Sequence, residues 1–369
     1  MGNFDSCDIS RQFALVAPFR ALSCPALLYA ILSASARHIS QRRGAESSPN
    51  IPSAIGELQI SPEVALEYQD ICISHLISLA EDTTNAQDED LLAAAVVLRF
   101  YEEIDAPLVG VDDEIYLCGI QIFIEAQSQY RLESAGLRSA AFWVGIRQEI
   151  HTAFLEQRGI RFNLSCPRLS SYRSLDPTDD STWANRVILH CADVLTYCYG
   201  EEIPIVDRYD HLLGYSQGWL TSKPPTFSPI YYKSPSQSDE GMFPQIWYLG
   251  DCQVASTQHW HLARMLLAAF DPRIPRIGPR QKKRLVEQDN EIKENVFHLC
   301  GIAYSNKTAS GLITACMGIS MCGDRFTEKS EQEALLEVLI KTEQLHALST
   351  TRAQRQLREA WGWSESSIP

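Results

Sequence analysis

The chain has 369 residues, 45% hydrophobic and 21% charged, a composition that predicts a folded globular protein and argues against disorder. Its 46 acidic and 32 basic residues give a formal charge of −14, which disfavours direct nucleic-acid binding. The amino terminus does not have the pattern of a signal peptide, and no apolar run approaches the roughly 20 residues of a membrane span. We therefore expect an intracellular protein without membrane contact.

Apolar residues recur at helical spacing along most of the chain, and no strict two-residue alternation persists, so the sequence predicts an all-α fold. Ser61 before Pro62 is typical of a helix start. The helices expected in chain order are Pro25–Gln41, Pro62–Glu81, Asp88–Ile104, Asp112–Gln129, Ser139–Gln157, Ser181–Tyr199, Asp207–Leu220, Pro244–Phe270, Lys282–Tyr304, Ser310–Cys322, Glu328–Leu345 and Ala353–Trp361.

Three segments between these helices are rich in residues that form turns. Arg43–Gln59 and Thr221–Gly241 are expected to be loops or crossovers, and the second could cover a pocket. Asp271–Lys283 (DPRIPRIGPRQKK) is the one concentrated basic segment of the chain. We interpret it as a solvated linker, and contact with a phosphate or a protein partner is the alternative.

The chain contains eleven cysteines, and no two of them are spaced as CxxC. Zinc sites of the finger and cluster types need such short spacings, because one turn of the chain must present two thiolates to one ion. Several cysteines lie in apolar helical stretches, where reduced core thiols are the usual finding. The sequence therefore predicts no metal site. It also carries no phosphate loop, dinucleotide fingerprint or HExxH motif, so we expect no cofactor.

Several stretches, in order, resemble the middle homology region of fungal-specific transcription factors, in the subgroup related to the arginine-catabolism activator. The first four are CPALLYAILSASARHIS, LLAAAVVLRFYEEID, AAFWVGIRQEIHTAFLEQRGIRFNL and TWANRVILHCADVLTYCYG. A W…P…F.P signature follows at Trp219, Pro225, Phe227 and Pro229, and the order closes with FPQIWYLGDCQVASTQHWHLARMLL, NVFHLCGIAYSN and TTRAQRQLREAWGW. The resemblance spans residues 11–363.

The resemblance implies an α-helical domain over residues 11–363, with helical hairpins around a central cavity, between short tails at 1–10 and 364–369. Ordinary members also carry an amino-terminal zinc cluster with six cysteines. This chain begins about ten residues before the homology region, and Cys7 and Cys24 cannot supply six ligands. If Met1 is the natural start, the DNA-reading function does not carry over.

The first candidate site lies on the expected helix Ser139–Gln157. Trp143, Arg147 and His151 are spaced i, i+4 and i+8, which places an aromatic ring, a cation and an imidazole on one helix face. Arginine can bind a substrate oxygen, and histidine can exchange a proton near neutral pH. The alternative is that Arg147 is structural, bound to a helix C-terminus or to a carboxylate such as Glu102.

A second group of candidates lies on the expected helix Pro244–Phe270. His261 could face a cavity with Trp260, while Trp247 and Tyr248 belong to an aromatic concentration that could form its walls. The alternative for each of these residues is ordinary core packing.

Two further patterns suggest catalysis, and we give both less weight. His190 and Asp193 are three residues apart on one helix and could form an acid–base pair, although an ordinary intrahelical contact is the default. Ser216 lies in a literal GxSxG, but the segment before it is a poor strand, so a hydrolase elbow is not expected.

Stand-alone proteins that resemble zinc-cluster regulators without the cluster include hetero-Diels–Alderases of fungal tropolone sesquiterpenoid biosynthesis. This resemblance implies a cofactor-free pericyclase of secondary metabolism, acting on hydrophobic small molecules, with dehydration to a quinone methide as a possible first step. Such chemistry needs a proton donor, an acceptor and a hydrogen bond to a carbonyl. His151 or His261 would move the proton, Arg147 would polarise the carbonyl, and Trp143, Trp247, Tyr248 and Trp260 would form the walls.

The alternative is a regulator without its zinc cluster, acting as a corepressor, a decoy dimer partner or an effector sensor. A gene model that has lost its cluster is a third interpretation, although the opening MGNFDSCDISRQF reads as an independent start. An enzyme would be cytoplasmic and a regulator nuclear. The sequence leaves homodimerisation open.

Overall fold

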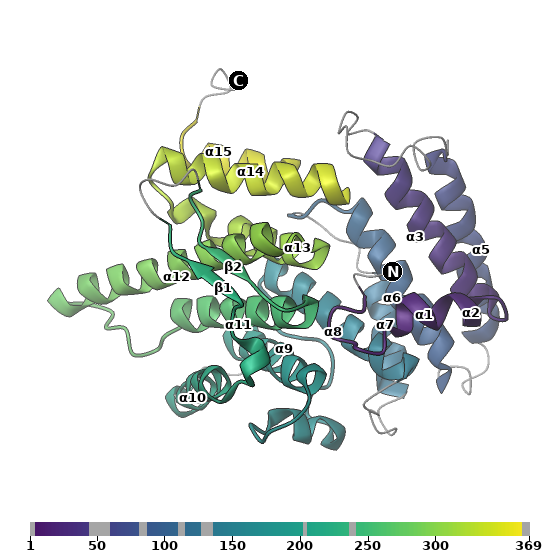
Figure 1. The fold of residues 1–369 in the computed structure, drawn as a ribbon, viewed down its shortest axis with the longest axis horizontal. Coiled ribbons are helices and arrows are strands. Elements are labelled where there is room, and N and C mark those ends of the chain that lie inside the picture. The colour runs from purple at the N-terminus through teal and green to yellow at the C-terminus, as the bar shows by residue number, and fades with distance from the viewer. Residues whose placement is uncertain are drawn as a thin grey trace. The chain divides into compact units, whose positions relative to one another are not determined.

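The structure is a computed structural model that describes residues 4–43, 60–80, 87–109, 115–126, 136–201, 205–235 and 241–363 (Figure 1). Helices dominate these ranges, which confirms the predicted all-α class. Within the same ranges, the regular strands are β1 (Tyr231–Lys233) and β2 (Gln245–Trp247), which pair antiparallel. None of the described helices is both long and apolar enough to cross a bilayer.

The α-helices are α1 (Gln12–Leu15), α2 (Ala17–Ala21), α3 (Pro25–Arg43), α5 (Pro62–Ala80), α6 (Glu89–Asp105), α7 (Ile115–Ala126), α8 (Leu137–Glu156), α9 (Asp180–Tyr199), α10 (Val206–Ser222), α11 (Asp251–Ala269), α12 (Pro279–Asn306), α13 (Ala309–Cys322), α14 (Lys329–His346) and α15 (Thr351–Ala360). Short 3₁₀ helices are η2 (Pro167–Arg173), η3 (Pro225–Phe227) and η4 (Gly323–Arg325).

Each of the twelve predicted helices overlaps an observed helix. Of the predicted spans, residues 81, 112–114 and 127–129 lie outside the described residues, as do residues 44–59 of the first predicted loop and the tail 364–369. Helices α1 and α2 were not predicted, because four or five residues are too few to display a period of 3.6.

Side-chain caps explain where several helices begin. Asp88 accepts a hydrogen bond from the backbone N–H of Asp90 at the start of α6, and Asp179 accepts one from Thr182 at the start of α9. The Thr308 hydroxyl does the same for Gly311 at the start of α13. Each cap binds one of the N–H groups that a first helical turn leaves without a partner.

One predicted helix, Pro244–Phe270, is wrong over its first seven residues. Residues Gln245–Trp247 form β2 and lie opposite Lys233 to Tyr231 of β1, and α11 begins at Asp251. Gly250 precedes α11 in a fully extended conformation. Aromatic and β-branched residues such as Ile246 and Trp247 favour strands, and here they form one by pairing with β1.

The chain divides into two compact units, and each is described separately. Unit 1 comprises residues 1–5, 10–148 and 340–352, and unit 2 comprises residues 6–9, 149–339 and 353–369. In unit 1, α3 packs against α5 and α6, and α6 packs against α7. Leu92, Val96 and Leu98 of α6 are fully buried there. The predicted single domain over residues 11–363 stays a prediction.

Unit 2 is built on α11, which packs against α9, α12 and α13. Trp183 of α9 stacks on Trp219 of α10 at a centroid distance of 6.1 Å, and the Trp219 indole donates to the Trp183 carbonyl. Phe227 packs edge-on against Trp219. The aromatic members of the W…P…F.P signature therefore form part of this core.

Candidate functional site

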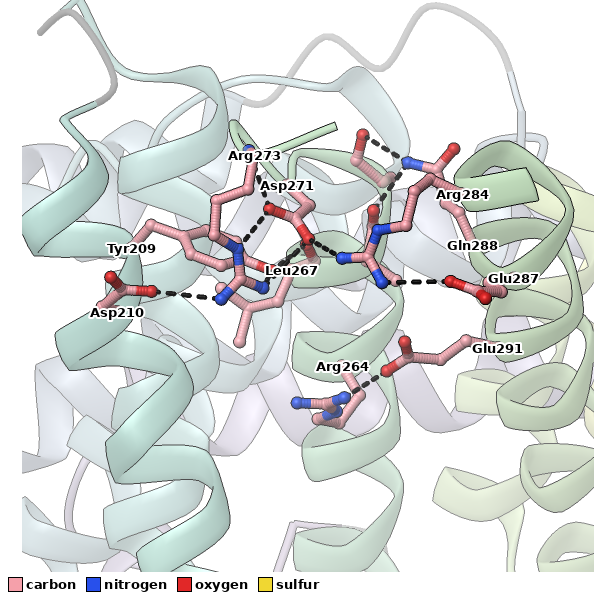
Figure 2. Close-up of polar contacts among 12 residues, drawn as sticks. Tyr209, Asp210, Arg264, Leu267, Asp271, Arg273, Arg284, Glu287, Gln288 and Glu291 are labelled. Atoms are coloured by element: carbon pink, nitrogen blue, oxygen red, sulfur yellow. Dashed lines mark hydrogen bonds and ion pairs between the residues drawn. The ribbon is translucent and has the colours of Figure 1, made fainter. Parts of the chain in front are cut away.

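A polar pocket of about 210 Å³ lies in unit 2, between α10, α11, the loop after α11 and the first half of α12 (Figure 2). Helix α10 contributes Tyr209, Leu213 and Gln217, which are spaced four residues apart and so share one face. Six charged side chains also line the pocket: Arg264 of α11, Asp271 and Arg273 of the loop, and Arg284, Glu287 and Glu291 of α12.

Local residues explain the conformation of the loop from Asp271 to Gly278. Asp271 comes after the end of α11, and its side chain accepts a hydrogen bond of 2.9 Å from the backbone N–H of Arg273. Such a bond is typical of an Asx turn. Gly278 has φ 97°, a left-handed conformation that favours glycine, and Pro279 then occupies the first turn of α12.

The Asp271 carboxylate is the centre of the charge network in Figure 2. Arg273 donates to both of its oxygens, with Nε at 2.8 Å and Nη2 at 3.0 Å, and Arg284 approaches at 3.5 Å. Burial by itself raises the pKa of Asp271, but the hydrogen bonds from Arg273 outweigh burial and hold this pKa below its ordinary value. The carboxylate is therefore ionised and fixed at neutral pH.

Tyr209 supports the same network from α10. Its hydroxyl donates to the Leu267 carbonyl at 3.0 Å, near the C-terminal end of α11, and the Arg273 guanidinium lies 4.7 Å from its ring centroid. Gln288 donates to the carbonyls of Ala268 and Ala269. The last carbonyls of α11 thus find partners in α10 and α12, which fixes the three helices around the pocket.

One nitrogen of the Arg264 guanidinium has no hydrogen-bond partner among the described residues. Nη2 of Arg264 pairs with Glu291, and the guanidinium lies 5.9 Å from the ring centroid of Trp260. The nitrogen without a partner is Nη1, which is buried. A buried guanidinium N–H normally has a partner, so Nη1 of this pocket-lining residue is a donor whose hydrogen bonds are unused among the described residues.

His190 of α9 is close enough to Arg264 for the two charges to interact. The imidazole is buried, lies 4.9 Å from the Tyr215 ring centroid, and has no partner at Nε2 among the described residues. Burial lowers the pKa of His190 to about 3, and the charges of His211 and Arg264 act in the same direction. The imidazole is neutral at pH 7.

The suggested acid–base pair of His190 and Asp193 does not form. Asp193 instead accepts hydrogen bonds of 2.9 and 2.8 Å from Nε and Nη2 of Arg173. Ser216 lies within α10 and is fully buried, so it is not on the exposed strand-to-helix turn that a nucleophile elbow requires. Its carbonyl accepts a hydrogen bond of 3.0 Å from the Trp260 indole.

The structure brings together two of the predicted site residues on α11. Trp260 packs edge-on against His261 at 5.0 Å, and His261 stacks on His298 of α12 at 5.1 Å. Nδ1 of His261 is 2.7 Å from Oδ1 of Asn295, which fits a neutral imidazole that donates at Nδ1. Burial, helped by the charge of nearby His298, lowers the pKa of His261 to about 3.

Trp247 and Tyr248, the predicted walls, lie at and after β2. Trp247 is 45% exposed, opposite Tyr231 on β1. Tyr248 is half-buried against Ile246, Val254 and Ile302. Neither residue lines the pocket described above.

Trp143 and Arg147 belong to unit 1. Trp143 is buried and packs edge-on against Phe142 at 5.3 Å. Nη2 of Arg147 donates to the Phe4 carbonyl at 2.8 Å, so Arg147 holds the amino-terminal segment, while Glu102 pairs with Arg99.

His151 is half-buried on the same helix, in the part that belongs to unit 2. The proposed catalytic roles of Arg147 and His151 stay predictions.

Sequence reasoning missed most of the pocket residues. Its one signal was the basic segment after α11, which we interpreted as a solvated linker. Arg273 is paired with Asp271 and Asp210, so part of that segment is structured. Among the described residues, no group of three or more His, Cys, Asp or Glu could hold a metal ion.

Comparisons of the chain with family models, with curated proteins and with solved structures found no match. The resemblance to fungal transcription factors therefore stays a prediction.

Proposed function

We propose that this chain is a small-molecule-binding protein of the effector-sensing type, whose ligand enters the polar pocket of unit 2. The observation that supports the proposal is the buried Nη1 of Arg264, which lacks a partner among the described residues while the other charged side chains of the pocket are paired. Burying a donor without a partner costs about 1–3 kcal/mol, and a ligand oxygen would recover that free energy.

The pocket chemistry indicates the kind of ligand. Three arginines and three carboxylates balance in formal charge, so a polyanion would gain little net attraction. The spare Nη1 of Arg264 carries two N–H donors, which suits a single small anionic group such as a carboxylate. A volume of about 210 Å³ lies below the roughly 300–1,000 Å³ typical of sites for drug-sized ligands, so we expect a small metabolite.

A thermal-shift titration with small carboxylates of increasing size (acetate, succinate, benzoate and glycine) tests the proposal. A ligand at about 100 times its Kd stabilises by about 2.7 kcal/mol, which should raise Tm by roughly 3–4 °C in a chain of 369 residues. Arg264→Gln should abolish that rise. Arg325→Gln, which removes an arginine–aspartate pair outside the pocket, should retain it. If no carboxylate shifts Tm, or if Arg264→Gln binds as the parent does, the proposal is wrong.

The cofactor-free hetero-Diels–Alderase is a second proposal. It is favoured by Trp260, His261 and Arg264 on one stretch of α11, where the neutral imidazole could hydrogen-bond a substrate and the guanidinium could polarise a carbonyl. The test incubates the purified protein with a tropolone alcohol and a humulene-type alkene. Product formed at the same rate and with the same stereochemistry as in buffer would reject it. Turnover that survives in folded Arg147→Ala and His151→Ala would show these two residues to be structural.

A further inference from the structure

The ion pairs of the unit 2 pocket use nearly all of its charged atoms. Arg273 binds both oxygens of Asp271, and Arg284 reaches Asp271 with one terminal nitrogen and Glu287 with the other, at 3.5 and 3.0 Å. The remaining nitrogen of Arg273 is 3.3 Å from Asp210, and a lysine lies 3.9 Å from the other oxygen of Glu287. These groups are already bound to one another and offer a ligand little.

The pair of Arg264 and Glu291 is different, because each partner has an atom that is unused. Nη2 of Arg264 binds one oxygen of Glu291, and Nη1 is buried without a partner among the described residues. The second oxygen of Glu291, Oε2, makes no hydrogen bond or ion pair with those residues, and the Glu291 side chain is 38% exposed. One ion pair in the wall of the pocket thus presents an unused donor close to an unused acceptor (Figure 2).

Such a pair is complementary to a ligand that carries both charges. An anionic group would accept a hydrogen bond from Nη1 of Arg264, and a cationic group would donate one to Oε2 of Glu291. A carboxylate without a cation would also bring its negative charge close to Glu291, which opposes binding. Because the two protein side chains are in contact, the two charges of the ligand must lie close together. The carboxylate and ammonium of an α-amino acid are joined through a single carbon atom and are both charged at pH 7.

The wall beside this ion pair is aliphatic. Two hydrogen bonds of 3.0 Å tie α10 to α11, one from the Trp260 indole and one from the Tyr209 hydroxyl. Leu213 of α10 and Arg264 of α11 lie between these two contacts, so they are at the same level, and both line the pocket. Ala268 lines it about one turn further along α11. An aliphatic side chain would find apolar partners here.

We propose that the ligand of this pocket is an aliphatic α-amino acid, whose carboxylate binds Nη1 of Arg264 and whose ammonium binds Oε2 of Glu291. The inference rests on the proposed function and makes it more specific, because a simple carboxylate would use only the first of these contacts. A volume of about 210 Å³ suits a free amino acid better than a peptide. A zwitterion has no net charge, so the formal charge of −14 on the chain does not repel it.

An NMR titration at pH 7 with matched pairs of ligands tests the proposal. Alanine and propionate differ only in the α-amine, as do leucine and 4-methylpentanoate. Each amino acid should bind about threefold to tenfold more tightly than the matching carboxylate, the range for one additional ion pair that is partly exposed. Leucine should also bind more tightly than asparagine, a polar amino acid of similar size, because the adjacent wall is aliphatic.

Glu291→Gln tests where the ammonium binds. This variant should bind leucine no more tightly than 4-methylpentanoate, while its affinity for 4-methylpentanoate should not fall, since Arg264 is still present. Equal losses for both ligands would instead indicate a purely structural role for Glu291 and would overturn the proposal. Glu294→Gln is the control, because it removes an exposed carboxylate of α12 that does not line the pocket, and it should keep the parental preference for leucine.

These measurements separate the amino-acid proposal from the proposed function. If the carboxylates bind the parent but the amino acids bind no more tightly, the ligand is not an amino acid, and the carboxylate pocket still stands. If neither kind of ligand binds the parent, both proposals are wrong. A preference for leucine that survives in Glu291→Gln would show that the ammonium does not bind at Glu291, and asparagine binding as tightly as leucine would show that the aliphatic wall does not select the ligand.

Discussion

At the scale of single residues, burial decides which of the titratable side chains can change charge. His190 is 3% exposed and His261 is 8% exposed, and burial lowers the pKa of both imidazoles to about 3. The residues next to each histidine in the sequence do not indicate its lowered pKa, because the side chains that surround it come from other helices. They are Tyr215 for His190 and Asn295 for His261. Neutral imidazoles in a packed core make the protein sensitive to acid.

Replacing His190 by phenylalanine should make the protein less sensitive to acid. The native pKa of about 3 lies below the unfolded value of about 6.5, so between these two pH values the unfolded chain binds more protons. The contribution of a neutral His190 is therefore present above pH 6.5 and is lost as the pH falls towards 3. At pH 5 the loss is about 2 kcal/mol.

Urea unfolding at pH 7 and pH 5 measures this effect. The difference in unfolding free energy between the two pH values should be smaller by about 2 kcal/mol in His190→Phe than in the parent. Replacing His75 of α5, in unit 1, by glutamine serves as the control and should leave the difference nearly unchanged. Equal pH dependence in His190→Phe and the parent would show that the buried imidazole is not the source.

At the scale of elements, the helices could be predicted because the period of apolar residues is itself the consequence of one buried face. The conformation of Gln245–Tyr248 could not be predicted in this way, because a strand needs a partner in another element of the structure. The Ile246 N–H donates to the Ser305 hydroxyl at 2.9 Å, and Asn306 bonds both the Ile246 carbonyl and the Tyr248 N–H. The end of α12 therefore completes the hydrogen bonding of the outer edge of β2.

The close contact between α12 and the segment that leads into β2 depends on Gly301 of α12, which has no side chain. A Cβ at position 301 would lie 2.3 Å from the Pro244 carbonyl oxygen, at the start of β2, so Gly301→Ala must displace the hairpin. We expect a loss of about 2 kcal/mol, the typical cost of overpacking. Gly214→Ala is the matched variant, since its Cβ on α10 meets no atom within 4 Å, and it should stabilise by roughly 0.5–1 kcal/mol. Urea unfolding measures the change in unfolding free energy for both variants. Changes of the same sign would contradict this account.

At the scale of the whole molecule, unit 1 is completed by residues near the carboxyl end of the chain. Residues 340–352 belong to it, and the Ser349 carbonyl accepts a hydrogen bond of 2.8 Å from the Leu108 N–H. Glu343 shapes this segment, because its carboxylate accepts from the backbone N–H and hydroxyl of Thr350 and from the Thr351 hydroxyl. No local pattern predicts a pairing between positions so far apart in sequence.

Glu343→Ala should loosen unit 1 at Leu108. Thr350 is fully buried, and loss of the carboxylate removes an acceptor from its hydroxyl and amide at a cost of about 1–3 kcal/mol. Hydrogen exchange at the Leu108 amide should accelerate roughly tenfold or more, since each 1.4 kcal/mol of opening free energy corresponds to a factor of ten. Amides of α9 in unit 2 should exchange as before. An unchanged rate at Leu108 would refute the link.

Local periodicity and residue type were enough to predict the all-α class and the positions of the longer helices. Which aromatic rings stack on Trp219, and which charges meet, depends on how distant segments pack. The tertiary structure placed Arg264 with Trp260 and Glu291, gave Asp271 its arginine partners, and bound Arg147 to the Phe4 carbonyl. A side chain has the same local pattern whether it faces a ligand or a neighbouring helix, and its partners are fixed only when distant segments pack.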